Sequence, residues 1–348
     1  MATDSGIIRF FLSFFGVVCF FSVCTVSFFS FLIAIIYLYY LHIFRTKNNM
    51  ESEEIEKYKE AGNIAKEAKN LAAEIVKIGA SDLDVAEKLE EFILSKTGER
   101  GGLAFPVSVC VNEIAAHKTP SIQNPYLFKK GDVVKIDLGV HINGYIADTA
   151  TTFDFGDNKN LLQTNKLALK KAIEAIKKDK PLGDLGKIVE QTMKGRGFMP
   201  ITNLAGHQIK PYNIHAGVSV PNCETNNQAK FQKGEAYAIE PFATTGCGLV
   251  VSSAGGGIMK VLKPEAKPRL ETSRTILKYV IDNFGLFEFS KRNILKKYPN
   301  AQLFIESLKK DGVLYEYPGL KEKTNAVVSQ FEDTILVLGD GKIIITTS

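Results

Sequence analysis

The segment 132–155 constrains the fold of this chain more than any other, because it has the pattern of a β-hairpin with one register. Residues 133–140 are rich in β-branched and apolar side chains, and residues 145–153 form a second β-like run. Asn143-Gly144 between them is a strong signal for a tight two-residue turn. Because side chains alternate between the faces of a strand, this turn determines which residues share a face.

Two aspartates lie inside the predicted hairpin. The turn places Asp148 opposite Gly139, and Asp137, two positions from Gly139, then projects from the same face as Asp148. Two carboxylates among Val, Ile, Leu and Ala side chains repel each other unless a cation or a proton lies between them. The alternative is a solvated strand face that carries two surface aspartates.

The chain from Met50 onward predicts a mixed α/β domain. With 348 residues, of which 45% are hydrophobic, it can bury one large core or two modest ones. Hydrophobic spacing, caps and Gly or Pro breaks predict its other elements. We expect helices at 51–78, 81–96, 159–177 and 182–196, a strand at 105–112 after a break at 98–102, Gly-, Pro- and Asn-rich strands up to 262, and final strands at 326–337 and 342–347.

Residues 264–323 differ in composition from the segments on either side. They are rich in Lys, with helical patterns at 269–284, 291–296 and 301–311 and a short extended element at 315–318. We interpret them as an insertion subdomain of about 60 residues on the main domain.

Residues 1–49 form an apolar N-terminal segment. No Asp, Glu, Lys or Arg occurs from Phe10 to Phe44, a run longer than the roughly 20 residues that a membrane-spanning helix needs. Arg45 and Lys47 follow the run, which favours a cytosolic location for the remainder of the chain. Two interpretations stay open: a transmembrane anchor, or a start codon assigned too far upstream, with the protein beginning at Met50.

Net charge and cysteine content exclude two classes of protein. The net charge of +5 is mild and the charges are interspersed, whereas a dedicated nucleic-acid groove needs clustered Lys and Arg. The five cysteines are odd in number and form no CxxC pair, which argues against a disulfide framework and favours a reducing compartment.

Three further segments each place one potential metal ligand in an apolar or β-like context. They are His207 in GHQI, Glu240 in IEPF and Glu332 in QFEDT. Taken singly, the histidine fits a hydrogen-bonded core residue and each glutamate fits an ion pair. Taken with Asp137 and Asp148, one imidazole and four carboxylates suit two divalent ions bridged by carboxylate oxygens.

These five residues, in this order, resemble the ligand signature of the "pita-bread" metallopeptidases. That family comprises methionine aminopeptidases, aminopeptidase P and prolidase, and the contexts IDLG–x–HINGYIADTA, GHxI, IEPF and QFEDT resemble its motifs from Met50 to the C-terminus. The resemblance implies an α/β (α+β) fold with an antiparallel curved sheet flanked by helices, so that residues 50–348 are the catalytic domain. It also implies the ligand roles: Asp137 on one ion, His207 and Glu240 on the other, and Asp148 and Glu332 as bridges.

Within that family, the chain resembles the type 2 methionine aminopeptidases. The segment 112–117 resembles the one that supplies their substrate-facing histidine, and no large domain precedes the catalytic part as it does in aminopeptidase P or prolidase. The insertion at 264–323 lies between Glu240 and Glu332, as in type 2 enzymes. We therefore expect removal of the initiator methionine from nascent proteins.

The resemblance also implies substrate-contacting and catalytic residues. His117 and His215 match the two active-site histidines that bind no metal, and Phe105 matches an aromatic wall of the methionine pocket, although it also fits a plain core position. Glu240 is expected to be the general acid–base, in addition to binding metal. A carboxylate-rich site with one histidine accepts Co, Mn, Fe or Zn, so two divalent ions of one of these metals are expected.

The partners expected are nascent polypeptides with an N-terminal Met, with the ribosome surface and, through residues 1–49, a membrane as further candidates. We expect a cytoplasmic monomer, or one anchored with its catalytic domain in the cytosol. Two other functions stay open: an X-Pro aminopeptidase of the same fold, and a non-catalytic homologue that binds ribosomes or RNA.

Overall fold

The computed structural model describes residues 50–176 and 180–348, and residues 50–348 form one compact unit. Across these two described ranges, no helix is both long enough and apolar enough to cross a membrane. The predicted anchor at residues 1–49 lies outside the described residues.

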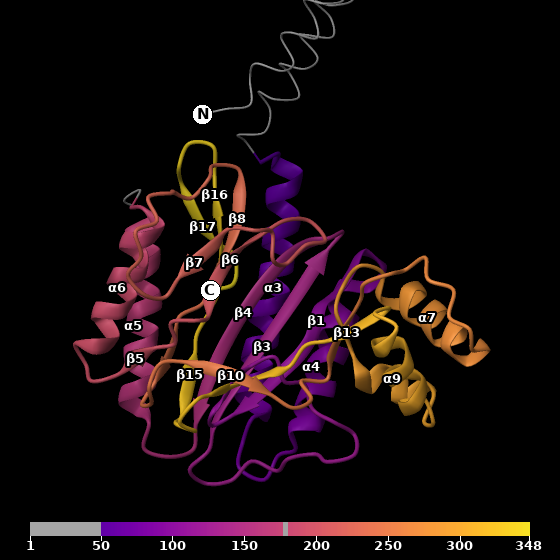
Figure 1. The fold of residues 1–348 in the computed structure, drawn as a ribbon. Coiled ribbons are helices and arrows are strands. Elements are labelled where there is room, and N and C mark those ends of the chain that lie inside the picture. The colour runs from indigo at the N-terminus through magenta and orange to yellow at the C-terminus, as the bar shows by residue number, and fades with distance from the viewer. Residues whose placement is uncertain (1–49, 177–179) are drawn as a thin grey trace, which may run out of the picture. The chain divides into compact units, whose positions relative to one another are not determined.

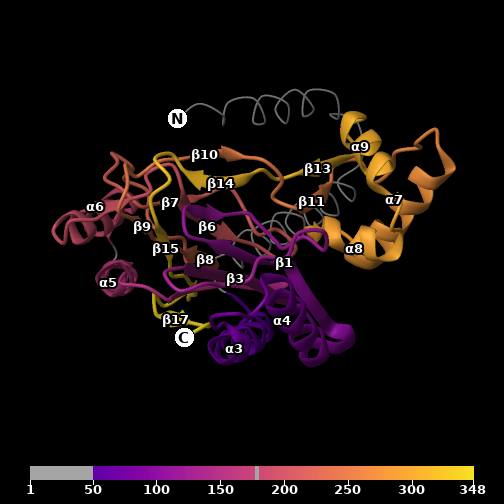
Figure 2. The same cartoon turned by 90° about the horizontal axis from the view of Figure 1, so that it is seen from below.

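The helices lie where the sequence predicts them, with ends that differ by a few residues, as helix ends usually do. In Figure 2, α3 and α4 cover one face of the central strands, α5 and α6 lie at one edge, and α7, α8 and α9 lie at the other. The helical elements of the described ranges are α3 (Ser52–Ile75), α4 (Asp82–Thr97), the 3-10 helix η2 (Gly98–Arg100), α5 (Lys159–Ile176), α6 (Leu182–Lys194), α7 (Glu271–Phe284), α8 (Lys291–Lys297) and α9 (Gln302–Lys310).

All strand pairs in the described residues are antiparallel, in sheets of three or five strands (Figure 1). The strands of two sheets carry four of the eight residues predicted for the site, and Glu240 and Glu332 are each adjacent to one of these strands. The first has the order β1 (Gly101–Val111), β3 (Val133–Ile142), β4 (Tyr145–Asp154); the second has the order β17 (Ile343–Ile345), β16 (Asp333–Val337), β8 (Glu235–Ile239), β6 (Ala205–Ile209), β7 (Ser219–Pro221).

Three smaller sheets complete the described residues. Their orders are β10 (Val250–Ser253), β14 (Gly319–Glu322), β2 (Ile114–Ala116); then β12 (Phe289–Ser290), β11 (Ile258–Val261), β13 (Leu314–Glu316); and finally β15 (Val328–Gln330), β9 (Phe242–Thr244), β5 (Met199–Pro200).

The β3–β4 hairpin has the register that the sequence predicts. Gly139 pairs with Asp148 across the two strands. Asn143 and Gly144 both adopt positive φ angles, 49° and 86°, as a two-residue turn of the favoured hairpin type requires. The prediction that Asp137 and Asp148 share a face is therefore confirmed.

Strand β1 begins at Gly101, so the predicted break at 98–102 is wrong in its second half. Gly101 and Gly102 pair with the end of β3, and a Cβ on Gly101 would overlap the backbone oxygen of His141. Glycine here permits a close approach of two strands, and it does not end the sheet.

The predicted continuous strand at 326–337 is also wrong, because it is interrupted between β15 and β16 at Phe331–Glu332. The backbone N–H of Glu332 donates to the oxygen of Ala150 in β4, at 3.2 Å. The chain therefore leaves the β9 sheet and joins the β8 sheet at this point.

The two large sheets have separate cores that meet between β4 and β16. Apolar residues of α3 and α4 pack on the first sheet, and those of α5 and α6 pack on the second. The Thr149 hydroxyl donates to the backbone oxygen of Glu332, at 2.6 Å. The Thr334 hydroxyl donates to the oxygen of Asp148 and accepts its N–H, at 2.7 and 2.8 Å. These bonds fix the two halves against each other beside Asp148 and Glu332.

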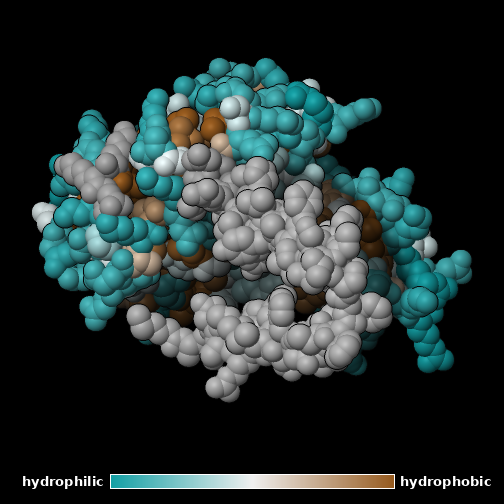
Figure 3. All heavy atoms as spheres, turned by 90° about the horizontal axis from the view of Figure 1, so that it is seen from above, coloured by the Kyte–Doolittle hydropathy of each residue, from teal (hydrophilic) through white to brown (hydrophobic). Residues whose placement is uncertain are grey.

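Residues 264–323 contain α7, α8 and α9 around their own apolar cluster, which includes Ile276, Val280 and Ile305. The single extended element predicted at 315–318 is incomplete, because β12, β13 and β14 all lie in this segment. Strand β12 has only two residues, so its sequence carries no detectable period. On the side shown in Figure 3, the coloured surface is mostly hydrophilic, in keeping with the interspersed charges of the sequence.

Candidate active site

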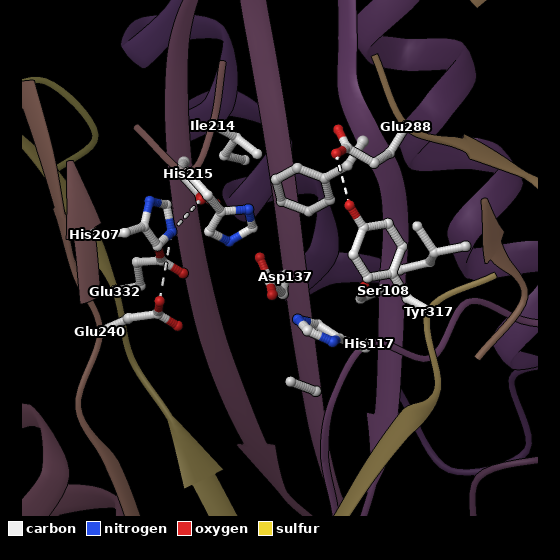
Figure 4. Close-up of a pocket in the computed structure, with 14 residues that line it drawn as sticks. Ser108, His117, Asp137, His207, Ile214, His215, Glu240, Glu288, Tyr317 and Glu332 are labelled. Atoms are coloured by element: carbon white, nitrogen blue, oxygen red, sulfur yellow. Dashed lines mark hydrogen bonds and ion pairs between the residues drawn. The ribbon is translucent and has the colours of Figure 1, made fainter. Parts of the chain in front are cut away.

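All the residues that the sequence predicts for the site line one cavity (Figure 4). The cavity lies between the two large sheets and the segment 264–323. Its lining consists of the predicted residues Phe105, His117, Asp137, Asp148, His207, His215, Glu240 and Glu332, together with Ser108, Ala116, Ile214, Ile258, Glu288 and Tyr317.

Asp137 and Asp148 reach the cavity from neighbouring strands of the hairpin. The described residues provide no hydrogen-bond donor to Oδ1 of either side chain, although both atoms are buried. Burial, and then the charge of Asp148, raise the pKa of Asp137 well above its ordinary value. Burial also raises the pKa of Asp148, to about 7.

His207 and Glu240 reach the cavity from β6 and from the residue that follows β8. His207 pairs with Ala238 across these strands, and a Cβ on Gly206 would overlap the backbone oxygen of Ala238. Glycine at 206 therefore lets β6 lie close enough to β8 to bring the two side chains together. His207 Nε2 lies 3.4 Å from Glu240 Oε1 and 3.5 Å from Asp148 Oδ2.

Glu332 reaches the cavity from the interruption between β15 and β16. Gln330 Nε2 donates to Glu332 Oε2 at 3.3 Å and to Asp137 Oδ2 at 3.4 Å, so one amide links carboxylates from both halves. One potential ligand atom each from Asp148, His207 and Glu332 lie within 4.8 Å of one another.

This cluster fits divalent metal ions. Burial, and then the charges of neighbouring carboxylates, raise the pKa of Glu240 and of Glu332 well above their ordinary values. Burial lowers the pKa of His207 to about 4, so its ring is neutral at neutral pH and can bind a metal. Asp137, Asp148 and Glu332 each keep one buried oxygen without a donor, and buried carboxylates that repel one another need either protons or a cation. Oxygen ligands with one imidazole suit a divalent transition metal.

His117 and His215 lie in loops on the same cavity. His117 follows β2 and faces Tyr317, with ring centroids 5.8 Å apart, and His215 lies 4.4 Å from the ring of His207. Burial, followed by the nearby His215 and His207 rings, lowers the pKa of His117 to about 4. Burial and His207 lower the pKa of His215 to about 4 as well. Both rings are therefore neutral hydrogen-bonding groups at neutral pH.

Phe105 is both a core residue and a cavity residue. It belongs to a buried apolar cluster and is 9% exposed, while it also lines the cavity. A Cβ on Gly139 would overlap the Phe105 ring, so glycine at this position of β3 provides the space for the aromatic wall. The two interpretations left open for Phe105 are thus compatible.

The sequence did not reveal six of the lining residues, of which Glu288 and Tyr317 are the most polar. Glu288 Oε1 accepts a hydrogen bond from the Tyr317 hydroxyl at 3.2 Å (Figure 4). It also accepts one from Lys260 Nζ, at 2.9 Å. A single acid between Phe287 and Phe289 was a usable signal, because an acidic residue in an aromatic run needs a buried partner.

Comparison with known proteins identifies a family that this chain matches. Residues 56–286 match the model of metallopeptidase family M24. A methionine aminopeptidase of Archaeoglobus fulgidus is 42% identical over 298 residues, which is 86% of this chain and all of the relative.

Solved structures with similar folds include a thermophilic Arx1, with a TM-score of 0.73, 18% identity, and coverage of 85% of this chain and 91% of that one. A methionine aminopeptidase of Thermotoga maritima has a TM-score of 0.63 and 23% identity, covering 86% of this chain and 98% of that one. At these identities the likeness concerns the fold alone, and it confirms the predicted pita-bread architecture.

Proposed function

Because the chain belongs to metallopeptidase family M24, and within it to the methionine aminopeptidases, we propose that it removes the N-terminal methionine from newly made polypeptides. The observation that carries this proposal is one cavity that joins the four carboxylates proposed as ligands, the His207 imidazole and two further neutral histidines. Residues 264–323 lie between Glu240 and Glu332, which supports assignment to the type 2 group.

The proposed metal centre holds two divalent ions. Asp137 would bind one ion, His207 and Glu240 the other, and Asp148 and Glu332 would bridge them. Support comes from the carboxylate oxygens without donors and from the close grouping of Asp148, His207 and Glu332. When bound, such ions supply Lewis acidity and make hydroxide available near neutral pH. The donor set accepts Co, Mn, Fe or Zn.

The chain's own residues supply proton transfer and orientation. Glu240 can accept a proton from the attacking water at a carboxylate oxygen and deliver it to the leaving amine, as a general acid–base. His215 can donate an N–H to the oxygen of the scissile carbonyl, where negative charge develops in the transition state. His117, on another side of the cavity, can contact the scissile amide. Both histidines can act as neutral donors because burial lowers their pKa values to about 4.

The apolar part of the cavity lining can accept the methionine side chain. Phe105, Ile214 and Ile258 give it apolar walls. A flexible thioether needs apolar contact and little hydrogen bonding, which favours methionine in such a slot.

The other two functions receive less support than methionine removal. A relative that matches 86% of this chain at 42% identity is a methionine aminopeptidase. Likeness to an Arx1 and to a Pyrococcus furiosus prolidase, both at 18% identity, extends to the fold alone. We propose a monomer that acts on nascent chains in the cytoplasm, with the ribosome surface as a candidate partner.

The direct test is hydrolysis of short peptides by the metal-loaded protein. We expect cleavage of Met-Ala and Met-Gly peptides, slow cleavage of Met-Lys peptides, and no cleavage of Ala-Pro peptides. Comparable rates on Leu-, Lys- and Met-initiated peptides would refute the methionine specificity. Glu240→Gln is the control, and loss of its proton acceptor should lower kcat by about 10²- to 10⁴-fold.

A further inference from the structure

His117 has an unusual backbone conformation for the residue type. Its φ angle is 61°, in the left-handed region, where a side chain with a Cβ is unfavourable. Such a conformation persists only where surrounding contacts hold it, and it is concentrated at functional sites. The contacts around the loop 117–120 therefore decide where the His117 ring lies.

One buried arginine of α8 binds this loop. Arg292 Nη1 donates to the Thr119 hydroxyl at 3.1 Å and to the backbone oxygen of Pro120 at 2.9 Å. Arg292 Nη2 donates to both oxygens of Glu90 in α4, at 2.6 and 2.7 Å. Arg292 is 3% exposed and Glu90 is 8% exposed, so the pair is removed from water.

The same contacts include strand β1 at Val107, between the cavity residues Phe105 and Ser108. Glu90 Oε1 accepts the N–H of Val107 at 3.2 Å, and the Thr119 hydroxyl donates to the oxygen of Val107 at 2.9 Å. The Thr119 N–H donates to the oxygen of Gly256, also at 2.9 Å. The loop is thus bound directly by β1 and α8, and Glu90 of α4 binds both Val107 and Arg292.

A buried ion pair is a poor way to gain stability, since apolar side chains of the same volume serve as well. Its advantage here is geometric, because a planar guanidinium can bind a carboxylate with one edge while its other N–H groups fix two loop acceptors. Arg292 does not touch the cavity itself, and its partners Glu90, Thr119 and Pro120 are also absent from the lining.

We propose that Arg292 is a positioning residue: paired with Glu90, it holds the loop 117–120 so that His117 faces the active-site cavity. The segment 264–323 then has a second role, since it sets the position of a residue on the main domain in addition to contributing cavity wall. This inference rests on the proposed peptidase activity and on the role proposed there for His117.

The test is a double-mutant cycle between Arg292→Met and His117→Ala, measured as kcat/KM on a Met-Ala peptide. If Arg292 acts through His117, the loss caused by His117→Ala should shrink by about tenfold in the Arg292→Met background, since coupled residues are not additive. A merely structural role would leave the two losses multiplicative, and that result would overturn the proposal.

Arg274→Met is the matched control. Arg274 lies in the same segment, is exposed, and donates only to the backbone oxygens of Pro268 and Arg269 among the contacts described. The loss of kcat/KM caused by His117→Ala should be the same in the Arg274→Met background as in wild type.

Hydrogen exchange gives a readout that needs no activity. The Thr119 amide should exchange at least about tenfold faster in Arg292→Met than in wild type, because local opening of the loop frees its bond to Gly256. In Arg274→Met the exchange rate of this amide should equal that of the wild type. If the wild type cleaves no peptide, the proposed function fails while this exchange still tests the loop contacts. If Arg292→Met does not fold, Thr119→Val removes only the hydroxyl and takes its place in both measurements. Multiplicative losses with unchanged exchange in that variant would equally overturn the proposal.

Discussion

Glu332 shows how one carboxylate can depend on both halves of the molecule. Its backbone N–H and C=O bond to Ala150 and Thr149 of the hairpin, while its side chain shares the amide of Gln330 with Asp137. Removing the charge of its side chain should therefore alter the metal centre without releasing the backbone.

We expect Glu332→Gln to lower the metal content of the loaded protein from about two ions per chain and to reduce kcat by at least about 10²-fold, because a bridging oxygen loses its charge. Elemental analysis, peptide turnover and circular dichroism measure metal, activity and fold. Glu306→Gln, on the exposed face of α9, is the control. Full metal content with normal turnover would show that Glu332 is no bridge.

Glu322, which does not line the active-site cavity, makes a pH-dependent contribution to stability. Burial alone would raise its pKa, but hydrogen bonds from Thr324, Ala326 and Cys247 outweigh burial and lower the pKa to about 2. A carboxyl with a depressed pKa stabilises the fold fully above its unfolded-state value, near 4.5, and loses this contribution as the pH falls towards 2.

Glu322→Gln should therefore lower the free energy of unfolding by about 1.5–3 kcal/mol at pH 7, the range for hydrogen bonds to a charged group. The difference from wild type should shrink below about pH 4.5, as the wild-type carboxyl begins to bind its proton. Urea unfolding of both proteins from pH 7 to pH 3.5 measures it. A difference that stays constant over this range would contradict the assigned cause.

At the scale of elements, close strand approach depends on glycine, and Gly206 is the position where the site depends on it most. Gly206→Ala would force β6 away from β8, because the added Cβ overlaps a backbone oxygen and no side chain can move aside. We expect a loss of about 1–3 kcal/mol in stability, as for other overpacked positions, together with weaker metal binding through displaced His207. Thermal unfolding and metal titration test this.

Gly102→Ala supplies the control for that prediction. Gly102 is also a strand glycine, in β1, and its nearest contact to an added Cβ is an ordinary 3.5 Å, to the His141 ring. If the two substitutions lower stability and metal binding equally, the close approach of β6 to β8 is not what holds His207 in place.

Elements were predictable from the sequence where local chemistry determines them. The Asn143-Gly144 turn and the two-residue period of its strands determine the hairpin register without reference to the remaining chain. The errors occur where a distant partner decides: Gly101 continues a strand because β3 lies beside it, and the chain breaks at Glu332 because β4 offers Ala150 as an acceptor.

The candidate site follows the same division at the scale of the whole molecule. Each predicted ligand has a distinctive local context, so it could be found in the sequence, and the fold then brings them all to one cavity. Tyr317 lacked such a context, and the aromatic run around Glu288 indicates only a buried partner, because the place of both residues in the cavity depends on how the segment 264–323 packs. Arg292 was missed for the same reason, since its partners lie about 170 and 200 positions away.

The catalytic domain should function without residues 1–49. Residues 50–348 form one compact unit, and helix α3 has its own N-terminal cap, in which Glu54 Oε2 accepts the N–H of Glu51 at 2.9 Å. Met50 packs on a buried cluster of that unit and must be kept. A protein that starts at Met50 should therefore be soluble, with the metal content and thermal stability of the full chain. Its kcat/KM on a Met-Ala peptide should lie within about twofold of the full-chain value, since parts of a protein that do not contact each other act independently.

Comparison of this truncated protein with the full chain decides between the interpretations of residues 1–49. Aggregation or inactivity of the truncated protein would mean that those residues belong to the fold, which would contradict the division at Met50. If the truncated protein is active while the native protein fractionates with membranes, residues 1–49 are an anchor that holds the enzyme near its substrates. If N-terminal sequencing finds that the native protein begins at Met50, translation starts there, and the active truncated protein is the native enzyme.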